Sequence, residues 1–365
     1  MNIMHPVLAL DESRCRNNIG FMAKKASENG CVLRPHFKTH QSKEVGRWYY
    51  QAGVRNITVS SIAMARYFAG HWEDITLAVP FNIRAIDELN ELLQKQKMVL
   101  MVDSISTSEF LSDNLRQPVE LWIEIDSGDH RTGINPDNKS VIDGILETIA
   151  ASPNLKLKGF YSHAGHSYKD RGKEEVLNTL ESMKKDMLNI KERYHDNYGP
   201  FEINIGDTPC CVLGEDLSWA DSISAGNFVF FDVMQSVIGS CTTDQLGVAM
   251  VCPVISKNEE RREIAIHGGV VHFGKDVLTT DAGPQYGLVA TWEGDRWGSI
   301  LNNCRLKYIS QEHGIIHADE DTFSKINIGD LLAVLPVHSC ISADSMRGYV
   351  TLDGKKADHM KGMGI

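Results

Sequence analysis

The first strand expected in this chain ends in the stretch Cys31-Val32-Leu33-Arg34-Pro35-His36-Phe37-Lys38-Thr39-His40, where an apolar run gives way to a loop that carries a lysine. In barrels of alternating strands and helices, active sites lie at the C-terminal ends of the strands. Removal of a lysine from water lowers the pKa of its amine and frees the amine as a nucleophile. We therefore interpret Lys38 as a desolvated, Schiff-base lysine. The alternative is a surface lysine whose ammonium group stays solvated.

Short apolar runs that end in polar residues or glycine recur through the first two thirds of the chain. Segments with helical spacing of apolar residues, such as 83–94, 141–150 and 173–194, separate them. The eight runs are 32–38, 57–60, 75–79, 98–103, 119–126, 157–163, 201–206 and 223–227. Eight strand-helix alternations predict an α/β fold of the (β/α)8, or TIM, barrel type. An open doubly wound sheet shows the same alternation but usually has fewer strands.

The pattern changes near Cys241, where apolar runs follow one another without helical segments between them. Examples are 247–254, 263–266 and 330–337. We therefore predict a barrel domain at 15–240 and a C-terminal β-rich domain at 241–365. We expect the N-terminal residues 1–14 to pack on the second domain.

Composition narrows the class of protein. The chain has 365 residues, 42% of them hydrophobic and 23% charged, and a formal net charge of -11. Clustered Lys and Arg, which a nucleic-acid partner requires, are missing, so no nucleic acid is expected. No secretion signal or run of 18 apolar residues occurs, so we expect no membrane partner and a cytoplasmic location. The eight cysteines are scattered without a Cys-x-x-Cys pair, which favours buried thiols over disulfides.

The ends of the predicted strands are rich in reactive side chains, and on a barrel they converge on one face. Loops after the seventh and eighth strands typically bind the phosphate of a cofactor, because glycine lets backbone N–H groups approach an anion. Gly206-Asp207-Thr208 and Gly226-Asn227 occupy those places, although each is also a common turn sequence. The candidate site residues are Lys38, Arg131, Tyr161, His163, His166, Tyr168, Gly206, Thr208, Gly226 and Asn227.

Six motifs together resemble a known family. They are Arg34-Pro35-His36-Phe37-Lys38-Thr39-His40, Asp126-Ser127-Gly128-Asp129-His130-Arg131-Thr132-Gly133, Tyr161-Ser162-His163-Ala164-Gly165-His166-Ser167-Tyr168, Gly206-Asp207-Thr208-Pro209, Gly226-Asn227-Phe228-Val229-Phe230-Phe231-Asp232 and Pro336-Val337-His338-Ser339-Cys340. In this order they resemble pyridoxal-phosphate enzymes of the alanine racemase fold, within the group of eukaryotic-type D-serine dehydratases and D-threonine aldolases. The resemblance covers nearly the whole chain.

The resemblance implies that Lys38 carries pyridoxal 5'-phosphate, with Tyr161 and Tyr168 near the cofactor. It implies that Thr208, Gly226 and Asn227 surround the ring or the phosphate, and that Arg131 lies near the phenolic oxygen. Ordinary packing is the alternative for the tyrosines, and a surface ion pair with Asp126 or Asp129 is the alternative for Arg131. Such enzymes are commonly homodimers, and we expect a homodimer here.

His338-Ser339-Cys340 places an imidazole and a thiolate two residues apart, on the same face of an extended segment. Zinc suits this pair, although two ligands are too few for a structural zinc site. In the resembling dehydratases the pair holds a catalytic zinc, whereas the aldolases tend to have aspartate in place of the cysteine and to use manganese-type ions. Cys340 therefore favours zinc over manganese, and a dehydratase.

These observations predict a metal-assisted lyase that acts on β-hydroxy D-amino acids. If Lys38 takes the α-proton, hydroxide leaves and the products are a 2-oxo acid and ammonia. If His166, His163 or a metal-bound water takes the hydroxyl proton, glycine and an aldehyde result. Both histidines could instead be hydrogen-bonded structural side chains.

One segment, 266–276, departs from the family pattern. It contains His267 and His272 where a Val-Asp-Ala-Gly-like strand is common in the family. The additional imidazoles could alter substrate choice or supply the second base that a racemase needs, or they could be polar interface residues. An amino-acid racemase and a non-catalytic pyridoxal-phosphate carrier therefore remain alternatives.

Overall fold

The computed structural model describes residues 2–362, and these residues form two compact units. The first, which we name the barrel unit, consists of Gly20–Lys38 and Tyr49–Phe228. The second, the β unit, consists of the chain up to Ile19, the segment Thr39–Trp48 and the chain from Val229 onward. These ranges differ from the predicted domains 15–240 and 241–365, which stay a prediction.

A parallel sheet of eight strands forms the centre of the barrel unit, in the order β2-β9-β8-β7-β6-β5-β4-β3. A parallel bridge between His36, just beyond β2, and Thr58 on β3 nearly closes the sheet into a barrel. The predicted barrel is confirmed, and each of the eight predicted runs overlaps one of these strands. The strands are β2 (Val32–Leu33), β3 (Asn56–Val59), β4 (Asp74–Pro80), β5 (Met98–Val102), β6 (Val119–Ile125), β7 (Leu155–Ser162), β8 (Glu202–Ile205) and β9 (Ser222–Ile223).

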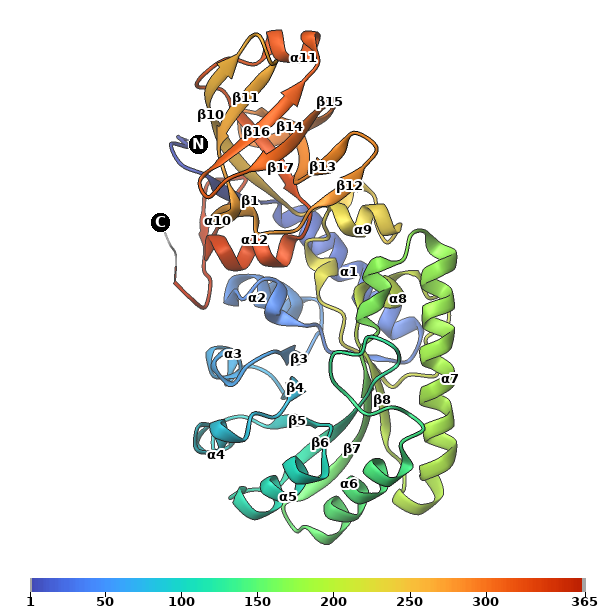
Figure 1. The fold of residues 1–365 in the computed structure, drawn as a ribbon. Coiled ribbons are helices and arrows are strands. Elements are labelled where there is room, and N and C mark those ends of the chain that lie inside the picture. Colours follow the sequence, from blue (N-terminus) through green and yellow to red (C-terminus); the bar gives the residue numbers. More distant parts are fainter. Residues whose placement is uncertain (1, 363–365) are drawn as a thin grey trace. The chain divides into compact units, whose positions relative to one another are not determined.

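Helices surround these strands, as Figure 1 shows for α3 to α7. Because a parallel strand is covered on both faces, it is apolar along its length, and every residue of β5 is buried. Serine caps begin α3 and α5, since the side chains of Ser61 and Ser104 accept hydrogen bonds from backbone N–H groups of the first turn. The helices of the first 228 residues are α1 (Glu12–Glu28), α2 (Lys43–Gln51), α3 (Ile62–Phe68), α4 (Ile86–Leu93), α5 (Ile105–Asn114), α6 (Lys139–Ala151), α7 (Lys173–Tyr198) and α8 (Thr208–Leu213).

A mostly antiparallel sheet forms the core of the β unit, in the order β11-β16-β15-β14-β17-β10-β1-β18-β19. The strand β1 (Val7–Leu10), from the N-terminal segment, pairs antiparallel with β10. The other strands of the unit are β10 (Val248–Asn258), β11 (Glu263–His267), β12 (Leu278–Thr280), β13 (Gly283–Gln285), β14 (Gly287–Glu293), β15 (Arg296–Ile309), β16 (His313–Ala318), β17 (Leu331–Pro336), β18 (Tyr349–Thr351) and β19 (Lys356–Ala357).

Short helices interrupt the β unit, and those beyond Cys241 fall where the sequence pattern predicted only strands. They are α9 (Val233–Ile238), α10 (Val270–Phe273), α11 (Glu320–Lys325) and α12 (Ser339–Met346). The predicted extended conformation of 338–340 is therefore wrong beyond its first residue. His338 is extended, with φ -131° and ψ 108°, but it is the cap residue of α12, and Cys340 lies in the first turn of that helix. No helix within residues 2–362 is both long and apolar enough to cross a membrane.

Candidate active site

Lys38 lies on a short 3-10 helix, η1 (Phe37–Thr39), which follows β2. Phe37 anchors this turn, because its ring is fully buried against Tyr49, Phe68 and Trp72 at centroid distances of 5.2, 5.0 and 5.1 Å. Lys38 itself is exposed, so the prediction that the protein removes its amine from water is wrong for this structure. The aromatic cluster fixes the backbone of the loop and leaves the lysine side chain accessible.

The predicted histidines follow β7, near Lys38 and Arg131. Burial lowers the pKa of His163 well below its usual value, and the positive charges of Lys38, Arg131 and His166 lower it further. The structure thus brings these four candidates together at one end of the barrel strands and keeps His163 neutral. Arg131 is 56% exposed, and its Nε lies 3.9 Å from Asp129 Oδ2.

His166 lies on η3 (Gly165–Lys169), the turn that also carries Tyr168. Its Nδ1 is buried and has no hydrogen-bond partner among the described residues. Gly128 approaches the imidazole so closely that a Cβ there would lie 3.1 Å from Cε1. The imidazole is therefore packed closely against Gly128.

Tyr161 and Glu124 lie side by side, paired in register between β7 and β6. Both are buried. Burial, and next the charge of Glu124, raise the pKa of Tyr161, so its hydroxyl stays protonated. Burial likewise raises the pKa of Glu124 to about 7, although Thr132 Oγ1 donates a 3.0 Å hydrogen bond to this carboxylate. Glu124 was not predicted as a site residue. The one feature of the sequence that could have indicated it is a charged residue inside an apolar run.

The loops after β8 and β9 meet at Thr208, whose buried Oγ1 accepts a 3.1 Å hydrogen bond from the backbone N–H of Asn227. Asp207 caps α8 by accepting a 2.7 Å hydrogen bond from Cys210 N–H. Burial raises the pKa of Asp207 to about 6, beside the loops expected to bind a phosphate. At Gly206 a Cβ would lie 2.5 Å from the Tyr161 hydroxyl, so only glycine fits there.

These barrel residues fit pyridoxal phosphate. The cofactor needs an accessible lysine amine, polar groups for its ring and hydroxyl or backbone N–H donors for its phosphate. The structure provides an exposed Lys38, a buried Tyr161 hydroxyl, an unpartnered His166 nitrogen and the Thr208 hydroxyl. The roles of the individual residues stay predictions.

The β unit contains the predicted metal pair. The pair, His338 and Cys340, lies beside the fully buried side chain of Asp232. Asp232 Oδ2 lies 3.2 Å from His338 Nδ1 and accepts a 3.0 Å hydrogen bond from Ser339 N–H. The other oxygen of Asp232 caps α9 through Gln235 N–H at 2.9 Å. A carboxylate on Nδ1 is the usual partner of a metal-binding histidine, because it fixes the ring and directs Nε2 toward the ion. Sequence reasoning assigned no role to Asp232, although an aspartate before a helical segment is a capping signal.

Cys340 and His338 influence each other's protonation. Burial alone would raise the pKa of the Cys340 thiol, but the charge and hydrogen bond of His338 outweigh this effect and lower it. Burial alone would lower the pKa of His338, but the thiolate and Asp232 raise it. Cys340 Sγ also lies 3.3 Å from Thr39 Oγ1. A thiolate beside an imidazole suits a divalent ion such as zinc.

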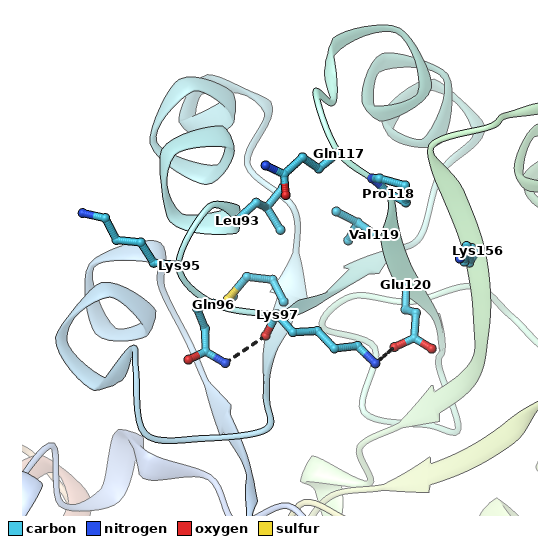
Figure 2. A pocket seen from close by; sticks show the side chains of 10 residues that line it. Leu93, Lys95, Gln96, Lys97, Gln117, Pro118, Val119, Glu120 and Lys156 are labelled. Carbon is cyan, nitrogen blue, oxygen red and sulfur yellow. Dashed lines mark hydrogen bonds and ion pairs between the residues drawn. The ribbon is translucent and has the colours of Figure 1, made fainter.

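A hollow of about 480 Å³ lies at the opposite ends of the barrel strands, where β5 and β6 begin (Figure 2). Lys97 Nζ spans part of it to reach Glu120 Oε2 at 2.6 Å. None of the candidate residues lines this hollow, so we do not interpret it as the active site. Its other lining residues include Leu93, Gln96, Gln117 and Lys156.

Comparison with known proteins agrees with this architecture. Residues 10–231 match the family model "Alanine racemase, N-terminal domain", and residues 247–352 match "Putative serine dehydratase domain". D-serine dehydratase of Dictyostelium discoideum is 27% identical over 95% of this chain and 93% of its own length. D-threo-3-hydroxyaspartate dehydratase of Delftia sp. HT23 is 26% identical over 95% of this chain and 93% of its own.

The solved structure of this Delftia enzyme has a TM-score of 0.91 and covers 98% of both chains. D-threonine aldolase from Filomicrobium marinum, 16% identical over 99% and 98% of the two chains with a TM-score of 0.79, shares the fold.

The barrel with a lysine after its first strand, together with a β-rich second unit, defines a protein of the alanine racemase fold. More particularly, the chain belongs to the family of the alanine racemase N-terminal domain, in the branch that also contains the serine dehydratase domain. The predicted family is confirmed.

Proposed function

We propose that this protein is a pyridoxal-phosphate-dependent, metal-assisted lyase that dehydrates β-hydroxy D-amino acids. The observation that carries the proposal is the group Asp232, His338 and Cys340, in which a buried carboxylate contacts the imidazole beside a thiolate. Support comes from the two dehydratases that match nearly the whole chain. A variant of a D-threo-3-hydroxyaspartate dehydratase has been solved in a metal-free form, which supports a metal ion in that dehydratase.

When bound, pyridoxal phosphate would supply an electron sink for charge at Cα, and a divalent ion, zinc rather than manganese, would supply a Lewis acid for the β-hydroxyl. Lys38, exposed on its anchored turn, has the accessible amine needed to remove the α-proton. Loss of the β-hydroxyl followed by hydrolysis then yields a 2-oxo acid and ammonia. His163 stays neutral, and its lowered pKa makes it a weak base for the proton transfer that the aldolase outcome requires. A homodimer and a cytoplasmic location remain predictions.

The experiment is to load the purified protein with pyridoxal phosphate and zinc or manganese, and to analyse the products from D-serine, D-threonine and D-threo-3-hydroxyaspartate. We expect a 2-oxo acid and ammonia with zinc, and a large loss of turnover in Lys38→Ala and Cys340→Ala. Cys304→Ala, which removes another thiol of the β unit, is the matched control and should retain activity. Glycine would identify an aldolase, and L-amino acid a racemase. Absence of turnover with every substrate and metal would contradict the lyase and favour a carrier.

A further inference from the structure

Three side chains outside the proposed active-site groups meet in the β unit: His267, His272 and Glu312. One potential ligand atom from each lies within 4.8 Å of the others. Glu312 Oε2 is 3.9 Å from His267 Nε2 and 3.9 Å from His272 Nε2. All three residues are half-buried. The two histidines are the imidazoles for which the sequence suggested a role in substrate choice, a second base or an interface position.

Backbone hydrogen bonds hold the segments that carry these side chains. Gly268 N–H donates to Glu312 O at 2.8 Å, and Val270 N–H donates to Ser310 O at 2.8 Å. In addition, β11 and β16 pair antiparallel, with His267 opposite His313. The three side chains therefore approach one another on a frame fixed by main-chain bonds, which is the preorganisation that a metal site requires.

The tautomer of His272 is also determined by the backbone. Its Nδ1 accepts a 3.0 Å hydrogen bond from Gly269 N–H, so Nε2 carries the proton in the free protein, and ligation by Nε2 requires the proton to move to Nδ1 and this bond to break. Gly269 cannot carry a side chain, because a Cβ would lie 2.3 Å from Ser310 O. The short helix α10 consequently sits directly on the 310–312 turn and presents His272 to Glu312.

Two further imidazoles surround this group. The His313 ring lies 6.3 Å from the His267 ring, and the His5 ring lies 6.0 Å from it in an edge-on arrangement. Both His5 and His313 are exposed. Either could move to supply a fourth ligand.

We propose that His267, His272 and Glu312 bind a divalent first-row transition metal ion at a second site, which shares no residue with the His338–Cys340 pair. Two imidazoles and one carboxylate form a common ligand set for zinc, cobalt and related ions. Ligand atoms about 2.1 Å from a tetrahedral ion are about 3.4 Å apart. The two 3.9 Å separations therefore need to close by about 0.5 Å, and the separation of the two imidazole nitrogens, which is within 4.8 Å, by at most about 1.4 Å, through rotation of the side chains.

The ion would tie α10 to the 310–312 turn. Because α10 is also bonded to α12 by Ser342 Oγ, which donates to Phe273 O at 3.0 Å, the second site would brace the helix that carries Cys340. We infer a structural role for this ion, and it requires no change in the proposed reaction.

The test uses the full chain with Cys340→Ala, which removes the thiolate of the first pair, and measures zinc binding by calorimetry and equilibrium dialysis. We expect one tightly bound zinc, and an affinity lower by about 100-fold or more when Glu312→Gln is added. This substitution preserves side-chain shape, so misfolding is not expected to explain the loss. His272→Ala should act in the same way, whereas His195→Ala, which removes an exposed histidine of the barrel unit, should have no effect.

Cobalt distinguishes the two sites by their chemistry. In the Cys340→Ala protein, bound cobalt should show visible ligand-field bands without a thiolate charge-transfer band, since all proposed ligands are nitrogen or oxygen. A zinc stoichiometry unchanged by both Glu312→Gln and His272→Ala would overturn the proposal. The same conclusion would follow if the Cys340→Ala protein bound no zinc or cobalt.

Discussion

Replacement of Glu124 by glutamine should change how stability depends on pH. In the folded barrel unit Glu124 is 4% exposed, and burial raises its pKa from 4.5 to about 7. One oxygen accepts the Thr132 hydroxyl, but Oε2 is buried without a hydrogen-bond partner among the described residues. The ionised form is therefore destabilised in the folded state, whereas the unfolded chain ionises freely.

The sign of the effect follows from proton binding. Between pH 4.5 and about 7 the folded state keeps the proton that the unfolded state has lost, so the free energy of unfolding falls as pH rises. A pKa difference of about 2.5 units at 1.36 kcal/mol per unit amounts to about 3 kcal/mol. This contribution to the free energy of unfolding is fully present below pH 4.5 and is lost by pH 8. Glutamine cannot ionise, so the variant lacks this loss.

The assay is urea unfolding of wild type and Glu124→Gln between pH 4 and pH 8, followed by fluorescence in the absence of cofactor. We expect the free energy of unfolding of the variant, relative to wild type, to increase by about 3 kcal/mol over that range. Glu109→Gln, at an exposed position on α5, is the control and should leave the pH profile unchanged. Parallel profiles for wild type and Glu124→Gln would refute the assignment of a raised pKa to this carboxylate.

Two further predictions concern the proposed binding groups. Asp232→Asn should lower the metal affinity of the His338–Cys340 pair by about 10- to 100-fold, since the amide no longer orients His338. Asp319→Asn, which changes an equivalent cap on α11, is the control and should leave the affinity unchanged. Equal affinities of wild type and Asp232→Asn in equilibrium dialysis would exclude the orienting role. Gly206→Ala should destabilise the barrel by about 1–3 kcal/mol and weaken pyridoxal-phosphate binding, because its Cβ meets the buried Tyr161 hydroxyl at 2.5 Å. Gly20→Ala, in open space on α1, is the control, and the steric argument fails if the two variants have the same urea midpoint and cofactor absorbance.

The barrel was predictable because each of its strands is covered on both faces. A strand such as β5 is buried throughout, so its sequence is an uninterrupted apolar run that ends where the loop begins. The convergence of Lys38, Arg131, His163 and His166 follows from the same rule, since the C-terminal ends of parallel strands share one face. The accessibility of Lys38 could not be predicted from the sequence, because it depends on which residues pack against the buried Phe37 ring.

The short helices of the β unit could not be predicted from the sequence, for a physical reason. A four-residue helix such as α10 has too few internal hydrogen bonds to be stable alone. It forms because Ser310 O and Gln311 O accept hydrogen bonds from Val270 and Val271 N–H, and those acceptors lie about 40 residues away in sequence. Asp232 is similar, since its contact with His338 joins residues 106 positions apart. Local periodicity carries no information on such partners.

The placement of the two additional histidines bears on the choice between a lyase and a racemase. A second catalytic base needs an imidazole nitrogen that can reach the α-proton of the substrate. In the β unit, His272 Nδ1 accepts a backbone hydrogen bond, and Nε2 of each histidine lies 3.9 Å from the same Glu312 carboxylate. Both imidazoles are thus directed toward one another and toward a carboxylate, and His272, whose Nδ1 is occupied and whose Nε2 carries the proton, has no nitrogen available as a base. His267 and His272 therefore give the racemase alternative no additional support.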